Sequence, residues 1–308
     1  DIEKYIRELP RSFRQERVIY EATVYPPIYY VLATIPYYFM YEQDLLSRIF
    51  VVRLINLPIF IITLYFVYKS GKLLFAQAPF LLTVLIFFFG FHPMFSFVSA
   101  GTTSDNLYNL LGTITLYLGI NFVRIGWNFK WYVSVVVTSL LLWWTKPQAK
   151  LLLFILGLPI LFLPNRGQVK RGLLLIGIIS VFALGLNVIN LITGKQFLPE
   201  IPGWNVLAQK QLSVISHFKW TLTHTYREVM PWYWGVYRWL SLTYPRVVHR
   251  IINWIVLFAL IGLARLLLRP TKKDNFKRSI WFLVIAQLIY FFGLFIFDYI
   301  FDRAHGYS

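Results

Sequence analysis

The sequence predicts an all-α, polytopic integral membrane protein with about eight transmembrane helices and interfacial helices on its external loops. Of its 308 residues, 58% are hydrophobic and 14% are charged, which is about half the usual share of charged residues. Mean hydropathy is +0.60. The apolar residues lie in blocks of about 16 to 23, the length that a helix needs to cross a bilayer. This pattern excludes a water-soluble globular domain.

Eight apolar blocks define the predicted spans. They cover approximately 48–68, 78–98, 107–123, 130–145, 148–164, 171–192, 250–268 and 280–300. The chain then divides into an external loop, a six-helix core, an aromatic-rich external loop, and two further spans with a tail. These four parts are 1–47, 48–192, 193–250 and 251–308.

The distribution of charge predicts the orientation. The net charge is +17. If the spans alternate, four connections on one side carry 13 Lys and Arg residues and a single acid, Asp274. The positive-inside rule makes that side cytoplasmic, so both ends of the chain are external. The positive charge is therefore explained by the membrane and not by nucleic acid. The absence of Cys excludes disulfides, thiolate metal sites and Cys nucleophiles.

The first external loop contains an apolar segment, 25–41, that is rich in Tyr and interrupted by Pro26, Pro27 and Pro36. A spanning helix here would invert every later loop, so we predict an interfacial helix with its Tyr side chains at the headgroup level. The chain begins without Met and carries no signal peptide. We therefore expect at least one further span upstream.

A polar turn after the second predicted span offers the best candidate site. It places His92, Asp105 and Asn106 between two apolar helices. One interpretation is structural: Ser104 or Asp105 caps the helix that opens near Leu107. The other is functional: a helix amino terminus beside a carboxylate and an amide binds phosphate, directly or through Mg²⁺ or Mn²⁺ at Asp105.

Two basic residues lie near the external ends of predicted spans. Lys146 follows the fourth span, and Arg53 lies roughly 7.5 Å inside the first at 1.5 Å per residue. Both side chains can extend to the headgroups, which is the ordinary explanation. Alternatively, they bind the phosphate of a lipid. That alternative predicts that Asp105, Lys146 and Arg53 converge across different spans.

The long external loop concentrates aromatic residues between Met230 and Trp239. An aromatic belt at the membrane surface is the ordinary explanation. A more specific hypothesis is a carbohydrate-binding surface, in which Trp232 and Trp234 stack on sugar rings. The five His residues show no metal-binding spacing, and no Gly-rich phosphate loop is present.

Five motifs in register resemble those of a known family. They are Tyr25-Pro-Pro-Ile-Tyr-Tyr, Arg53 in the next span, His92-Pro with Thr103-Ser-Asp-Asn-Leu, Thr145-Lys-Pro, and Trp232-Tyr-Trp-Gly-Val-Tyr-Arg-Trp. They resemble the HPPLYY, NND(S/A)L, TK and FWGxFGW patterns of a bacterial and archaeal domain-of-unknown-function family of predicted membrane proteins. That family is similar to the GT-C glycosyltransferases. Tyr25 and Ser104 depart from its pattern, which has His and Asn at these positions.

The resemblance implies an inverting enzyme of a prokaryotic cytoplasmic membrane that passes a sugar from a polyprenyl-phosphate donor to a glycan, lipid or protein acceptor. It implies phosphate or substrate binding by Asp105, Asn106, Lys146, Arg53, His92 and Tyr25. The family's catalytic acid lies early on the first external loop, which places it before residue 1. Within this sequence, Glu21, Asp1 and Glu3 are only substitute candidates for that acid. We therefore expect this chain alone to bind donor without turnover.

Two other classes of function stay open. A lipid or polysaccharide transporter would need interrupted helices in pairs, with polar groups at mid-bilayer. A non-catalytic membrane assembly protein would explain the apolar spans but not the ordered polar clusters at one face.

Overall fold

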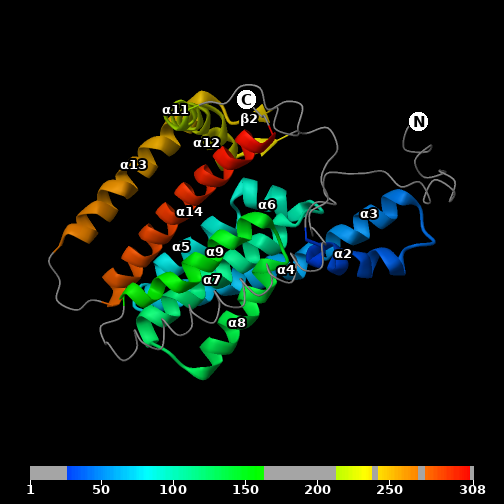
Figure 1. The fold of residues 1–308 in the computed structure, drawn as a ribbon, viewed down its shortest axis with the longest axis horizontal. Helices are drawn as coiled ribbons and strands as arrows, with labels where there is room; N and C mark the ends of the chain where they lie inside the picture. Colours follow the sequence, from blue (N-terminus) through cyan, green and yellow to red (C-terminus); the bar gives the residue numbers. More distant parts are fainter. Residues whose placement is uncertain (1–25, 163–212, 238–241, 270–274, 306–308) are drawn as a thin grey trace.

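A computed structural model describes residues 26–162, 213–237, 242–269 and 275–305. This part of the chain is helical apart from one pair of two-residue strands (Figure 1). The elements before the first gap are α2 (Ile28–Phe39), α3 (Leu45–Leu54), α4 (Asn56–Leu74), α5 (Pro79–Gly90), α6 (Pro93–Ala100), α7 (Asp105–Ile125), α8 (Phe129–Trp143), η3 (Pro147–Ala149), α9 (Lys150–Gly157) and η4 (Leu158–Phe162).

The later elements lie in the described parts of the second half. They are α11 (Val214–His224), the π-helical turn η6 (Thr225–Val229), α12 (Met230–Trp234), β1 (Val236–Tyr237), β2 (Leu242–Thr243), α13 (Arg246–Leu268) and α14 (Asn275–His305). The strands pair antiparallel, with Val236 opposite Thr243.

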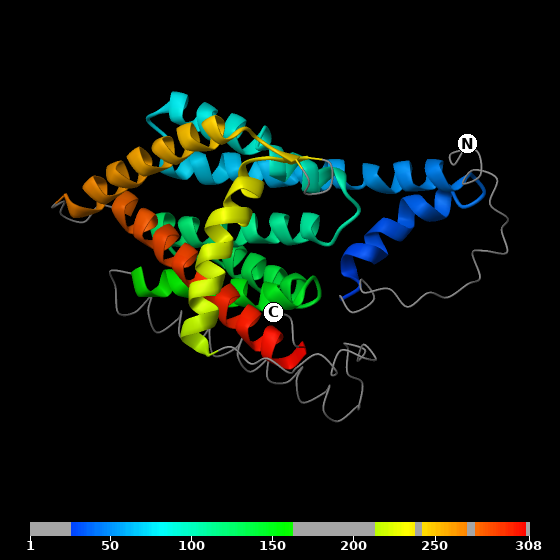
Figure 2. The same ribbon diagram turned by 90° about the horizontal axis from the view of Figure 1, so that it is seen from above.

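Helix α7 is the centre of the bundle and packs against α4, α8, α9 and α14 (Figures 1 and 2). Its buried residues include Leu107, Leu111 and Leu118, a spacing that keeps them on one side of a helix. The indole N–H of Trp131 on α8 donates to the carbonyl of Leu118, 2.9 Å away. The core is therefore built around a helix that carries the candidate site at its first residue, Asp105.

Three described helices are long and apolar enough to cross a membrane: Leu45–Leu74, Arg246–Leu268 and Asn275–Ile296. Helices α5 and α6 make a fourth if they count as one span bent by 49°. Two shorter apolar helices match the spans predicted at 130–145 and 148–164, while the span predicted at 171–192 lies outside the described residues. The helical membrane class agrees with the sequence analysis, and the count of eight spans stays a prediction.

Helix α13 shows why an apolar bilayer suits this fold. It has no buried residue, and its exposed side chains include Ile251, Trp254 and Phe258. Large apolar patches on a protein surface indicate contact with another protein or with lipid. The length of this helix, 23 residues, and its exposed apolar side chains therefore suit the hydrocarbon core of a bilayer better than water.

The segment predicted as interfacial forms α2, which continues through Pro36. Tyr38 is 80% exposed, as a headgroup-level side chain would be. Tyr29 differs from the prediction, because it is fully buried and its hydroxyl donates to Asn56 Oδ1 at 2.9 Å. The protein interior thus supplies the hydrogen bond that the prediction assigned to water.

Candidate functional site

The site begins with an ion pair between Asp105 and Lys146. Lys146 Nζ lies 2.6 Å from Asp105 Oδ1, and the side chains are 17% exposed for Lys146 and 39% for Asp105. The hydroxyl of Thr103 donates to Asp105 Oδ2 at 3.1 Å. The predicted convergence of Asp105 and Lys146 is confirmed, although they lie 41 residues apart.

The local prediction that Ser104 or Asp105 caps this helix was wrong. Helix α7 begins at Asp105 itself, and Ser104 makes no capping hydrogen bond with its side chain. The Asp105 carboxylate instead holds Lys146 and Thr103. The hydroxyl of Thr103 in turn accepts from the backbone N–H of Asp105, 3.3 Å away. The Asp105 carboxylate is therefore occupied by Lys146, from the turn after α8, and by Thr103.

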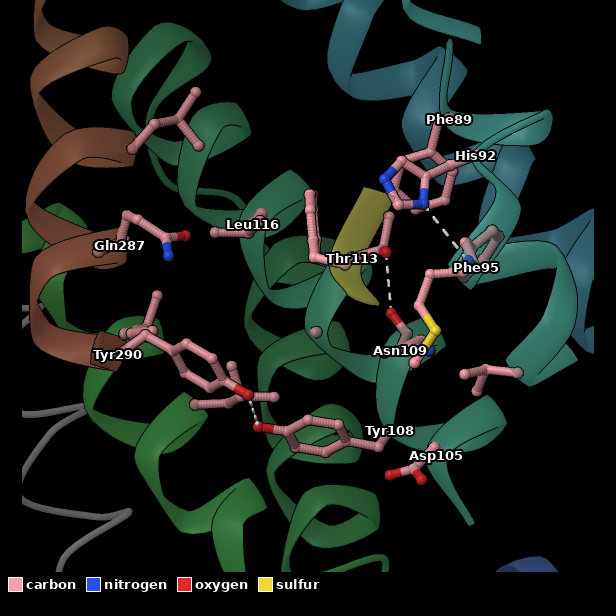
Figure 3. Close-up of a pocket in the computed structure, with 18 of the residues that line it drawn as sticks. Phe89, His92, Phe95, Asp105, Tyr108, Asn109, Thr113, Leu116, Gln287 and Tyr290 are labelled. Carbon is pink, nitrogen blue, oxygen red and sulfur yellow. Dashed lines mark hydrogen bonds between the residues drawn. The ribbon is translucent and has the colours of Figure 1, made fainter. Parts of the chain in front are cut away.

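Asp105 borders a pocket with a volume of about 610 Å³ (Figure 3). Its walls come from helices α5, α6, α7, α9, α12 and α14 and from His92, which lies between α5 and α6. The polar residues that line it are His92, Asp105, Tyr108, Asn109, Thr113, Tyr233, Gln287 and Tyr290. The remaining lining is mostly Phe, Leu and other apolar side chains. Such a volume with a few polar groups on apolar walls is typical of small-molecule sites.

Two tyrosines join the helices that face each other across this pocket. The hydroxyl of Tyr108 on α7 donates to the hydroxyl of Tyr290 on α14, with 2.7 Å between the oxygens (Figure 3). The residues are 182 positions apart in the sequence. This hydrogen bond fixes the spacing of α7 and α14 close to Asp105.

His92 lies at the break between α5 and α6 and begins the second of these helices. Its Nδ1 accepts from the backbone N–H of Phe95 at 3.4 Å, so a neutral ring carries its proton on Nε2. Nε2 is buried and has no hydrogen-bond partner. The His92 ring packs against Tyr233 and Trp234, at centroid distances of 4.7 and 5.8 Å. His92 is thus a lining residue of the pocket, as well as a helix cap.

Asn106 does not line the pocket. Its amide N–H donates to the carbonyl of Gly101 at 2.7 Å, and the amide of Asn56 donates to the same carbonyl at 2.9 Å. Both side chains are buried. Asn56 also accepts from Tyr29, so this network ties α2 and α4 to the turn that precedes Asp105. Asn106 is therefore part of the support of the site.

The structure separates the other predicted residues from Asp105. Arg53 is exposed on α3 and borders a different depression, together with Met40 and Leu46. It does not line the pocket beside Asp105, and its convergence with Asp105 and Lys146 stays a prediction. Helices α2 and α3 form a hairpin at one side of the bundle (Figure 1).

The pocket contains the residue between the two tryptophans that were predicted from the aromatic loop. Tyr233 lines the pocket, whereas Trp232 and Trp234 do not. Trp234 packs on Phe88 and His92, which do line the pocket. The predicted acids Asp1, Glu3 and Glu21, and Tyr25 with them, lie outside the described residues.

Several lining residues were not among the site residues proposed from the sequence. Asn109 and Thr113 follow Asp105 at successive four-residue steps, which places them on one side of α7. Gln287 and Tyr290 come from the last predicted span. A polar amide inside an apolar span, such as Gln287, was the available signal.

The site has little to hold a metal among the residues that the structure describes. In that part of the chain, no three His, Asp or Glu side chains come together as a ligand group. The divalent cation considered for Asp105 therefore stays a prediction that rests on one carboxylate.

Fold and site together define a helical membrane protein with a pocket beside the first turn of its central helix. The sequence identifies the family: residues 3–296 match DUF2142, described as a predicted membrane protein, and the chain belongs to that family. No curated protein and no solved structure matches it. The resemblance to a family of predicted membrane proteins is confirmed to this extent.

Proposed function

We propose that this protein is a membrane glycosyltransferase that moves a sugar from a polyprenyl-phosphate donor to an acceptor on the external face. The pocket beside Asp105 is the proposed donor site. The observation that carries this proposal is the meeting of Asp105 and Lys146 at the border of a pocket of about 610 Å³ with mainly apolar walls.

The pocket and its border offer a suitable partner for each of the three parts of such a donor: the phosphate, the lipid chain and the sugar. Lys146 does not line the pocket itself, but Asp105 holds it at the pocket border, where its ammonium is offered to the phosphate. The apolar walls, including Phe88 and Phe95, suit the lipid chain. Asn109 and Gln287 offer amides to a sugar.

The proposed chemistry is a single displacement at the anomeric carbon. The acceptor oxygen bonds to this carbon while the bond to the phosphate oxygen breaks, and configuration inverts. A carboxylate takes the acceptor proton, and the resemblance places that acid on the first external loop, where Glu21 and Asp1 are the stand-ins. Lys146 stabilises the negative charge that grows on the leaving phosphate.

The proposal includes the membrane arrangement predicted from the sequence. Eight spans alternate so that the turn before Asp105 and the segment around Lys146 share the external face. The Lys- and Arg-rich connections, such as Lys69 to Gln77, are cytoplasmic. The ion pair between Asp105 and Lys146 supports one part of this arrangement, because both residues must lie at the same membrane level.

One observation favours a transporter as the second candidate. Helices α5 and α6 form a pair bent by 49°, and His92 lies at the break. Interrupted helices of this kind form substrate sites in transporters. The two candidates differ in whether the sugar leaves its lipid.

The test uses full-length protein in liposomes with radiolabelled undecaprenyl-phosphate sugars and membrane-extract acceptors. Transfer of label to the acceptor is the expected result. Lys146→Ala should lower transfer by about 10- to 100-fold, because a phosphate partner is lost. Asp105→Asn should also lower transfer, since the ammonium is no longer held in place. Lys150→Ala is the matched control, because Lys150 lies nearby over the ring of Trp143.

Three outcomes contradict the proposal. Movement of labelled lipid between leaflets without transfer would replace it with the transporter. No transfer and no movement would reject both candidates. Equal losses for the variants of Lys146 and Lys150 would show a general surface charge effect in place of a phosphate site.

A further inference from the structure

Apart from Asp105, the polar side chains that line the pocket in the described part of the chain are neutral amides, hydroxyls and the His92 ring. Asn109 and Gln287 line it from α7 and α14, and their amides make no hydrogen bond within the described part of the chain. The amide of Gln287 extends from α14 toward α7 (Figure 3). The hydroxyl of Thr113 donates to the carbonyl of Asn109 at 2.8 Å, which leaves its oxygen able to accept. Neutral donors and acceptors therefore face each other across the pocket.

Among the described lining residues there is one carboxylate, and it is already paired. Asp105 holds Lys146 at 2.6 Å. Among the described residues that line the pocket, none is Lys or Arg. With Lys146 assigned to the donor phosphate and Asp105 already paired, a charged group on the sugar would lose water without gaining an unpaired opposite charge, and such desolvation is costly.

Flat aromatic rings complete the lining. Tyr233 and Phe89 contribute rings to the walls. The C–H face of a sugar ring packs on such surfaces, while its hydroxyl or acetamido groups need hydrogen bonds. Aromatic walls and open amides together match a ring with one apolar face and a neutral polar edge.

We propose that this pocket selects an uncharged sugar, which Asn109 and Gln287 bind by hydrogen bonds from two facing helices. This inference rests on the proposed function, because it assumes a lipid-phosphate donor at Lys146. It adds the class of sugar: a neutral hexose or acetamido sugar, in preference to an anionic or cationic one.

The experiment measures binding of four lipids to this chain in nanodiscs by quenching of Trp fluorescence. The lipids are undecaprenyl phosphate alone and undecaprenyl phosphate carrying glucose, glucuronic acid or glucosamine. The glucose lipid should bind at least tenfold tighter than each of the other three. Asn109→Leu and Gln287→Leu should each remove most of this preference and leave the affinity for undecaprenyl phosphate unchanged.

Matched variants control for general damage. Asn121→Leu removes an amide from the same helix, because Asn121 lies on α7 but does not line the pocket. Thr113→Val is compared with Thr115→Val, since each hydroxyl donates at 2.8 Å to the carbonyl four residues earlier and only Thr113 lines the pocket. The variants at Asn121 and Thr115 should keep the preference. Gln287 is exposed, so its variant tests the idea even where the one at Asn109 fails to fold.

Failure has two separable forms. Equal binding of all three sugar lipids, or tighter binding of a charged one, overturns the neutral-sugar inference and leaves the donor site standing. Loss of affinity for undecaprenyl phosphate in both amide variants overturns the assignment of these amides to the sugar. Binding of none of the four lipids rejects the proposed function itself.

Discussion

The hydroxyl of Tyr29 on α2 donates to Asn56 Oδ1 at the start of α4, with 2.9 Å between the oxygens and both residues buried. The amide of Asn56 continues to the carbonyl of Gly101, which also accepts from Asn106. Burial raises the pKa of the Tyr29 hydroxyl, so it remains a donor at neutral pH. This chain of hydrogen bonds supports the turn that leads to Asp105.

Tyr29→Phe is predicted to destabilise the protein by about 1 to 3 kcal/mol, because Asn56 Oδ1 would stay buried without a donor. Thermal unfolding in nanodiscs measures the change. Tyr38→Phe serves as the control, since Tyr38 is exposed on the same helix. Equal melting temperatures for the two variants would show that the hydrogen bond contributes nothing measurable.

The ion pair between Asp105 and Lys146 is testable without any assumption about function. A double-mutant cycle with Asp105→Asn and Lys146→Met should give a coupling energy of about 1 kcal/mol in unfolding measurements, because both charges are partly exposed. Coupling should weaken as salt increases. Strictly additive effects would mean that the two side chains do not interact in the membrane.

Gly119→Ala is predicted to loosen the contact between α7 and α14. An added Cβ would lie 2.2 Å from Cζ of Phe282, a ring that is fully buried and cannot move aside freely. Overpacking of this kind costs about 1 to 3 kcal/mol. Gly262→Ala, on α13, adds the same atom where nothing lies within 4 Å, and its melting temperature should stay close to that of the parent. A neutral Gly119→Ala would contradict the close approach of the two helices.

The predicted topology is tested by single Cys residues in this Cys-free chain. Thr102→Cys should react with an impermeant maleimide on intact cells, because the turn before α7 is expected outside. Gln77→Cys should react only after the membrane is opened, because its Lys-rich connection is expected inside. Both positions are exposed in the structure, so protection reports the side of the membrane. The reverse pattern would invert the orientation and move the proposed site to the cytoplasm.

Some features of the site could be read from local sequence. His92 and Asp105 stand out as polar residues between apolar segments, and both line the pocket. The step from Asp105 to Asn109 and Thr113 follows helical spacing. Arg53 shows the limit of such reasoning, because its depth along a predicted span did not reveal that it borders a different depression from Asp105.

The sequence by itself determined the helical membrane class. Its apolar blocks are long enough to cross a bilayer, and a helix satisfies all of its own backbone polar groups there. Only the tertiary structure decided which polar residues meet: Tyr29 with Asn56, Asp105 with Lys146, and Tyr108 with Tyr290. The physical reason is that hydrophobic periodicity is a property of one helix. Contacts between helices depend on how each is rotated and crossed when side chains interlock, and this depends on the whole bundle at once.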